Sequence, residues 1–150
     1  MLIPLLSLFI LSPLRAGQAD AATPPSASTP NTPDEAIKVE LELLQGRWKI
    51  MGGNLPPEFM EEGYIEIDGD RMIMWSGMNR KEMRLKIDPC KNPKQFDMLI
   101  SNRTALGIYK LEKDSLRLCY EVQANAVRPK CFPDVKSNTP IDLMLHREPK

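Results

Sequence analysis

The sequence carries no excess of charge of either sign. Its 150 residues include 20 Lys and Arg against 20 Asp and Glu, so the formal net charge is zero. Proteins that bind phosphate backbones need a basic surplus, and nucleic acid is therefore not an expected partner. The hydrophobic fraction of 42% is ample for a packed core. One folded domain with accessory sequence is expected.

Histidine is almost absent, which excludes several kinds of active site. The single histidine, His146, cannot build a three-histidine zinc site, and the sequence has neither an HExxH motif nor a paired-cysteine cluster. It also has no G-x-S-x-G elbow and no glycine-rich phosphate loop. We therefore expect a protein that is not an enzyme and that holds no cofactor and no metal, with His146 facing outward from a strand.

Hydrophobic runs long enough to cross a bilayer are missing too. The apolar run at residues 1–14 falls short of the ~20 residues that a membrane span needs. It has the length of a signal-peptide core, and Ala19 and Ala21 supply a small-x-small cleavage pattern. Residues 1–21 are predicted to be a signal peptide cleaved before Ala22. This implies a periplasmic or secreted protein with no transmembrane segment in its mature form.

The next residues, 22–33, are small, polar or proline and cannot bury apolar surface. They are predicted to be an extended linker, which either tethers the domain or is an inert leader left after cleavage. A folded domain is expected over residues 34–150. It begins with a helix, because Thr32 and Glu35 form a capping box and Ile37, Leu41 and Leu44 recur at helical spacing.

After Gly46 the pattern changes to short runs of alternating hydrophobicity separated by turn residues. Asp68-Gly69 is a strong hairpin turn, and residues 56–60 are predicted to form a helical turn. The fold class is therefore mainly β: a small antiparallel up-and-down barrel of about eight strands, preceded by one short α-helix. A two-sheet sandwich is the alternative. The predicted strands are residues 47–51, 64–67, 71–75, 81–87, 96–101, 106–111, 115–121 and 141–147.

Gly46-Arg47-Trp48, at the start of the first predicted strand, is similar to the G-x-W signature of lipocalins. In lipocalins an arginine of the last strand packs on this tryptophan, and Arg147 occupies the corresponding place. A guanidinium over an indole contributes ~0.5–2 kcal/mol and would join the two ends of the barrel. The resemblance implies a structural role for Gly46, Trp48 and Arg147.

The chain resembles more closely an uncharacterised lipocalin-like domain family that is abundant in planctomycete bacteria. The similar stretches cover about residues 44–148 and agree in order and spacing. The resemblance implies an exported barrel of no established activity, so it bears on the fold more than on the function. The stretches are LQGRWK at 44–49, IDP at 87–89, PK at 93–94, FD at 96–97, LGIY at 106–109, DSLRLC at 114–119 and RP at 128–129.

Three cysteines are an odd number for an exported domain, so at least one thiol stays free or pairs between chains. Cys119 belongs to the family pattern and is expected to be buried in a strand. Cys90 and Cys131 lie on predicted loops and depart from that pattern. We predict that these two form a disulfide. It would close a ~40-residue loop and stabilise the fold by roughly 3–4 kcal/mol. Pairing of Cys119 with Cys131 is the competing possibility.

Methionine is unusually frequent, with nine in the chain. Met72, Met74 and Met78 could hold Cu(I) through their thioethers, but filling a core is the more ordinary role for such residues. A flexible, methionine-lined barrel could adapt to apolar ligands. The residues expected to line such an interior site are Trp48, Met72, Met74, Tyr109 and Tyr120.

An acidic group of five residues lies near the Asp68-Gly69 turn, but its spacing does not match a calcium loop, so a solvated face is expected. Its members are Glu61, Glu62, Glu66, Asp68 and Asp70.

Two functions remain open from the sequence. The first is an exported binding protein that holds a small apolar molecule inside the barrel. The second is a cell-envelope interaction or structural module with a barrel filled by side chains, using loops such as Pro56-Pro57 and Arg128-Pro129 as contacts. An eight-stranded barrel can be either filled or hollow, and the sequence does not decide between the two.

Overall fold

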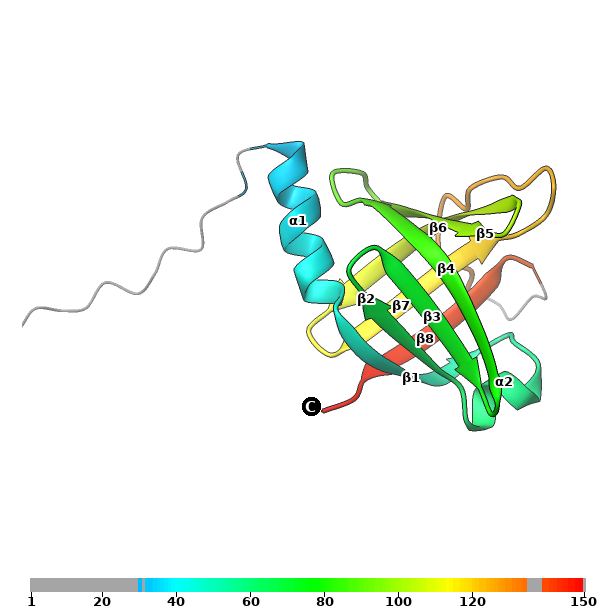
Figure 1. The fold of residues 1–150 in the computed structure, drawn as a ribbon. Helices are drawn as coiled ribbons and strands as arrows, with labels where there is room; N and C mark the ends of the chain where they lie inside the picture. The colour runs from blue at the N-terminus through cyan, green and yellow to red at the C-terminus, as the bar shows by residue number, and fades with distance from the viewer. Residues whose placement is uncertain (1–29, 31, 135–138, 150) are drawn as a thin grey trace, which may run out of the picture.

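The computed structural model describes residues 30, 32–134 and 139–149. The predicted signal peptide at residues 1–21 and most of the predicted linker lie outside this part of the chain. The described residues form a closed barrel in which each strand pairs antiparallel with the next and the last pairs with the first (Figure 1). The predicted up-and-down barrel is thus confirmed in place of the sandwich.

All eight predicted strands are present, several of them longer than the sequence pattern indicated. The fourth, fifth and sixth strands start earlier than predicted, because backbone pairing continues into the polar residues beside the turns. The strands are β1 (Gly46–Gly53), β2 (Tyr64–Asp68), β3 (Arg71–Ser76), β4 (Asn79–Asp88), β5 (Lys94–Ile100), β6 (Arg103–Glu112), β7 (Ser115–Glu121) and β8 (Ile141–Arg147).

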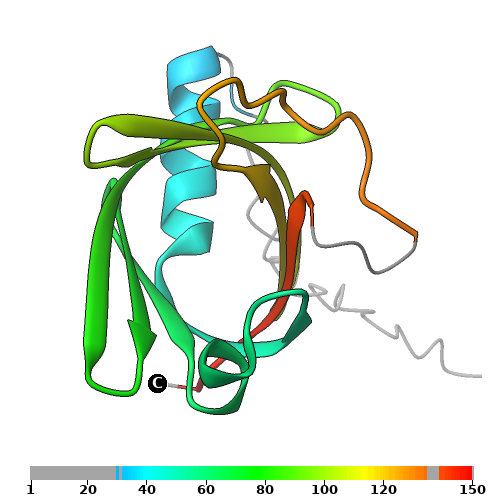
Figure 2. The same cartoon turned by 90° about the vertical axis from the view of Figure 1, so that its right-hand side faces the viewer.

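Helix α1 (Pro33–Leu44) precedes the barrel and lies across one of its ends (Figure 2). The Thr32 hydroxyl accepts a hydrogen bond from the Glu35 backbone amide at 3.2 Å, as the capping pattern predicted. The helix ends at Gln45, whose side chain exchanges two hydrogen bonds with the backbone of Gly69 in the β2–β3 turn. These contacts fix the helix against the barrel rim.

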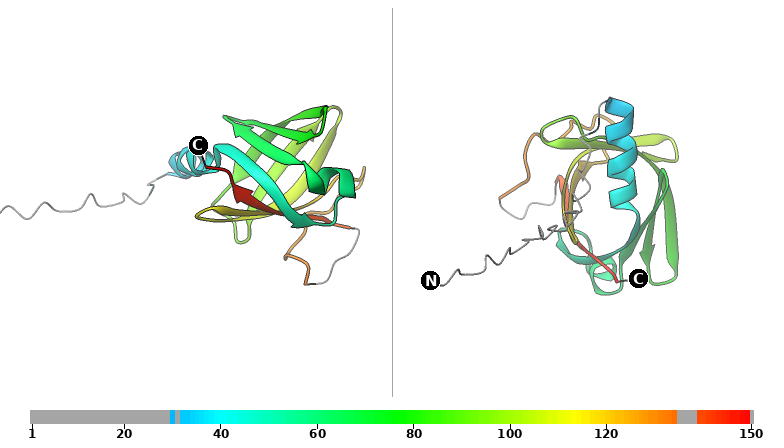
Figure 3. Two further views of the ribbon diagram at one scale, coloured as in Figure 1. Left: turned by 90° about the horizontal axis from the view of Figure 1, so that it is seen from below. Right: turned by 90° about the vertical axis from the view of Figure 1, so that its left-hand side faces the viewer.

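The opposite end of the barrel carries a short helix, α2 (Pro57–Glu61), within the β1–β2 connection (Figure 3). It begins where the Pro56-Pro57 pair predicted a helical turn. The Ser76 hydroxyl at the end of β3 donates to the Glu58 carbonyl oxygen at 2.9 Å, which joins this helix to the rim. Pro57 is therefore the first residue of an ordered helix.

The core is the barrel interior, filled by the inward-facing side chains of all eight strands. Leu44 of α1 closes this cluster at one end. Phe96, at its centre, meets the rings of Tyr109 and Tyr120 edge-on, with centroids 6.3 and 6.0 Å apart. Gly107 makes room for the Phe96 ring, because a Cβ at this glycine would lie 2.4 Å from it.

The chain after β7 folds back over the outer surface of the barrel (Figure 2). Arg128 fixes it there: the guanidinium donates to the carbonyl oxygens of Phe96 and Gly107 at 2.8 and 2.7 Å and pairs with the Asp97 carboxylate at 2.5 Å. The Arg128-Pro129 stretch, expected as a contact for partners, has its arginine turned onto the barrel. The Arg128 side chain is thus bound within the chain, and a contact with a partner at this loop stays a prediction.

Candidate functional site

Trp48 and Arg147 lie side by side where the first and last strands close the barrel. They are paired in register, and the Arg147 guanidinium carbon lies 4.1 Å from the Trp48 ring centroid. The indole Nε1 donates to the Leu44 carbonyl oxygen at 2.9 Å. Arg147 also donates to the carbonyl oxygens of Gln45 and Leu43 at 2.6 and 2.5 Å. This arrangement joins β1, β8 and the end of α1.

Gly46 supports the same junction through its backbone. Its φ of +116° lies in a region that L side chains rarely adopt, and it lets the chain leave α1 and enter β1 at once. The extended Gln45 caps the helix, and Gly46 is the first residue of β1.

The five residues expected to line an interior ligand site do lie inside the barrel. Their side chains belong to one buried cluster, with exposed fractions between 0% and 9%. They are Trp48, Met72, Met74, Tyr109 and Tyr120. The alternation of the strands thus brings together the residues that the sequence selected.

The pocket found between the interior side chains is too small for an organic ligand. It has a volume of about 10 Å³, and Met72, Tyr109 and Phe96 are among the residues that line it. Sites for small organic ligands measure roughly 300–1,000 Å³, whereas ~10–15 Å³ suffices for one water molecule. The expected ligand cavity is therefore not found, because methionine, leucine and aromatic side chains fill the barrel.

A polar group lies where α1 meets the rim. Glu40, buried on the helix, accepts from the Lys94 ammonium at 2.6 Å, and Tyr109 lies beneath them. The Tyr109 hydroxyl makes no hydrogen bond to any described residue. Burial, and secondly the nearby Glu40 carboxylate, raise the pKa of Tyr109 far above its usual range. This tyrosine therefore stays protonated and is a packing residue.

The Met72, Met74 and Met78 set does not form a metal site. Met72 and Met74 are buried in the barrel, whereas Met78 is fully exposed in the β3–β4 turn. The structure thus corrects the copper hypothesis for this set, since one thioether points away from the other two.

Two of the five acidic residues near the β2–β3 turn pair with arginines. Asp68 contacts Arg71, and Asp70 pairs with Arg84 at 2.9 Å. Across the described residues, no cluster of three or more His, Cys, Asp or Glu side chains could hold a metal ion.

The three cysteines are free thiols in this structure. Cys90 and Cys131 are both exposed. The disulfide between them stays a prediction. Cys119 is fully buried, but on the outer side of the sheet, since its neighbour Tyr120 faces inward. Burial raises the pKa of the Cys119 thiol to about 11. A protonated, covered thiol is unreactive.

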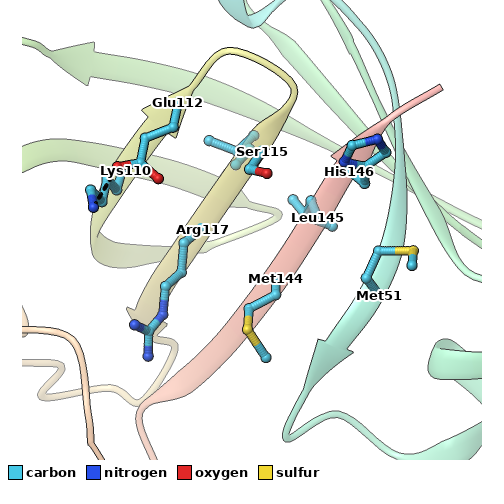
Figure 4. A pocket seen from close by; sticks show the side chains of 9 residues that line it. Met51, Lys110, Glu112, Ser115, Arg117, Met144, Leu145 and His146 are labelled. Carbon is cyan, nitrogen blue, oxygen red and sulfur yellow. Dashed lines mark ion pairs between the residues drawn. The ribbon is translucent and has the colours of Figure 1, made fainter. Parts of the chain in front are cut away.

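An apolar groove lies on the outside of the barrel across β6, β7, β8 and β1 (Figure 4). It measures about 430 Å³. Met51 and Met144 lie along it and are 63% and 45% exposed, which is unusual for such side chains. Lys110 and Arg117 border it, each paired with a carboxylate, Glu112 at 2.6 Å and Asp142 at 2.8 Å.

Sequence analysis missed this groove because it depends on an irregularity in β1. The pairing of β1 with β8 shifts register between Ile50 and Gly52, so Met51 is an extra residue in a bulge. Met144 leans over Gly52, where an added Cβ would lie 2.8 Å from its terminal methyl. The two glycines that follow Met51 were the one available signal, since glycine inside a strand often marks a bulge.

The fold and these sites define a class: a small up-and-down barrel with eight strands, a solid interior and helices at both ends. None of the described helices is long and apolar enough to cross a membrane. Comparison with protein-family models, with curated proteins and with solved structures gave no significant match.

Proposed function

We propose that this chain is an exported, non-catalytic binding protein, a relative of the lipocalin-like family, whose barrel is a solid scaffold. Its partner is a protein of the cell envelope that docks on the outer groove. The observation that carries this proposal is the filled interior, where the pocket between the side chains measures only about 10 Å³, so that binding is left to the outer surface. The small apolar ligand expected inside the barrel has no space in this arrangement.

The groove has the character of a protein contact. Methionine is enriched at interfaces because its flexible, polarisable side chain adapts to a partner's surface. Met51 and Met144 provide two such side chains on adjacent strands, and the paired charges of Lys110 and Arg117 form a polar border. An apolar side chain of the partner would bury both methionines.

Burial raises the pKa of Tyr109, Tyr120 and Cys119, so these three groups are poor nucleophiles and bases near pH 7. Export is supported by the signal-peptide pattern at residues 1–21 and by the cleavage pattern before Ala22.

Site-specific photo-crosslinking in the producing cell tests the docking surface. A photoreactive residue at Met51 or Met144 should give one discrete crosslinked product of higher mass. The same residue at Met78, which is fully exposed in the β3–β4 turn, should give none. Equal products at all three positions, or none at any, would contradict docking in the groove.

Native mass spectrometry of the mature protein tests the solid scaffold separately. We expect the bare polypeptide mass after Ala21 is removed, with no component that is lost on denaturation. A mass excess that disappears on denaturation would show that the interior opens for a ligand and would overturn the scaffold proposal.

A further inference from the structure

Three side chains with donor atoms for soft metals line the groove. Met144 and His146 are two residues apart on β8 and both face outward, since Leu145 between them is buried in the barrel. On the neighbouring strand, Lys49 is paired with His146 and Gly52 with Met144, so the bulged Met51 lies between these two pairs. Figure 4 shows the three side chains along adjacent strands.

The three side chains line the same groove on adjacent strands. Met144 already leans across onto β1, with its methyl against Gly52, the residue next to Met51. Met51 is 63% exposed. The side chains of Met51, Met144 and His146 make no hydrogen bond or ion pair with any of the described residues that would have to be broken.

We propose that Met51, Met144 and His146 form a binding site for a soft monovalent cation, Cu(I) or its analogue Ag(I). Thioether sulfur selects soft metals, and imidazole nitrogen binds copper. Thioethers and a metal-bound imidazole carry no charge as ligands, so they suit a cation of low charge. The site shares the groove with the proposed docking surface, but it does not require the envelope partner.

The charges around the site disfavour hard divalent cations. The carboxylate that lines the groove, Glu112, is paired with Lys110 at 2.6 Å, and Arg117 is held by Asp142. Lys49 is paired across from His146 and adds a positive charge. Calcium and magnesium need several oxygen ligands, which this groove does not supply from its described lining residues. The site is therefore expected to bind soft monovalent cations in preference to hard divalent ones.

Silver titration of the purified protein, followed by NMR of the methionine methyl groups, tests the proposal. Because the exposed thiols of Cys90 and Cys131 would bind silver first, both are replaced by serine. We expect one silver ion per chain and shifts of the Met51 and Met144 methyl signals. The Met78 signal should stay in place.

Single variants, made in the protein with Cys90 and Cys131 replaced by serine, test each of the three proposed ligands. Met51→Leu, Met144→Leu and His146→Gln should each weaken silver binding about tenfold or more, because each removes one donor. Met78→Leu removes an equally exposed methionine and should change nothing. The melting temperature of each variant separates loss of binding from loss of folding.

Undiminished binding in the Met51→Leu/Met144→Leu double variant would overturn the proposal, as would the absence of methyl shifts at equimolar silver. Calcium producing the same shifts would also contradict it. These results come from the isolated protein, whereas the docking surface is tested by crosslinking in cells. Failure of one proposal is therefore distinguishable from failure of the other.

Discussion

At the scale of single residues, Arg147 joins three parts of the fold. Its guanidinium stacks on Trp48 and donates to two carbonyl oxygens at the end of α1, those of Gln45 and Leu43. The planar guanidinium group of arginine has several N–H donors and can make these contacts together, whereas the ammonium group of a lysine cannot.

We predict that Arg147→Lys lowers the free energy of unfolding by about 1–3 kcal/mol, since it loses hydrogen bonds from a charged donor and the stacking on Trp48. Urea denaturation measures this change. Arg84→Lys is the control, because the Arg84–Asp70 ion pair is exposed and such pairs contribute ~0–1 kcal/mol. Equal losses in both variants would contradict the role given to Arg147.

Gly107 reports on how tightly the interior is packed. A Cβ at this position would lie 2.4 Å from the Phe96 ring and 2.9 Å from the Cys119 carbonyl oxygen. We predict that Gly107→Ala lowers the free energy of unfolding by about 1–3 kcal/mol through overpacking. Urea denaturation measures this change as well.

A double-mutant cycle with Phe96→Leu is the matching control. If the clash with the ring causes the loss, the double variant should be more stable than the sum of the single effects implies. Strict additivity would show that the barrel has spare room beside Phe96 and would contradict the solid interior.

At the scale of elements, the segment after β7 acts as a cover for one outer face of the sheet. Ile108 and Cys119 are paired across β6 and β7 and face outward, yet they are 1% and 0% exposed. Arg128 fixes the returning chain above them, and Arg117 donates to the Pro133 carbonyl oxygen at 3.0 Å. These contacts hold the returning segment against the outer face of the sheet.

We predict that Arg128→Lys loosens this cover and raises the rate of Cys119 alkylation about tenfold or more, because local opening exposes the thiol. Timed labelling with a thiol reagent, mapped by peptide mass, measures the rate. Arg103→Lys, an exposed arginine on β6, should leave Cys119 protected. Unchanged labelling in Arg128→Lys would show that another contact holds the cover.

At the scale of the whole molecule, one buried thiol and two buried phenols predict that the free energy of unfolding falls at high pH. Burial raises the pKa of Cys119 to about 11 and raises the pKa values of Tyr109 and Tyr120 as well. The unfolded chain releases these protons at lower pH, with a thiol pKa of ~8.5 and a phenol pKa of ~10. The stability they contribute is full below those values and is lost as pH rises toward the folded-state values.

We therefore expect the urea midpoint to fall steadily from about pH 8.5 upward. Cys119→Ala should flatten the early part of this decline, below the range where the tyrosines ionise, while Cys90→Ser should not. Denaturation curves at stepwise pH up to about 11 measure the effect. A midpoint independent of pH in this range would contradict the burial of these groups.

The sequence determined the fold to a large extent. Alternating hydrophobicity fixed the eight strands, since a residue's face depends on its position along the strand. Local signals also placed α1 and the turn at Asp68-Gly69. The G-x-W pattern with a late arginine indicated the contact of Trp48 with Arg147, because closing the barrel brings the first and last strands together.

The tertiary structure alone decided what the barrel can hold and where its outer surface is open. Whether side chains of known type leave a void depends on strand lengths and rotamers, which no pattern of residues encodes. The bulge at Met51 shifts the β1–β8 register and exposes a methionine, and the cover over Cys119 buries a residue that faces outward. Both depend on contacts between segments far apart in the chain, so only the folded molecule shows them.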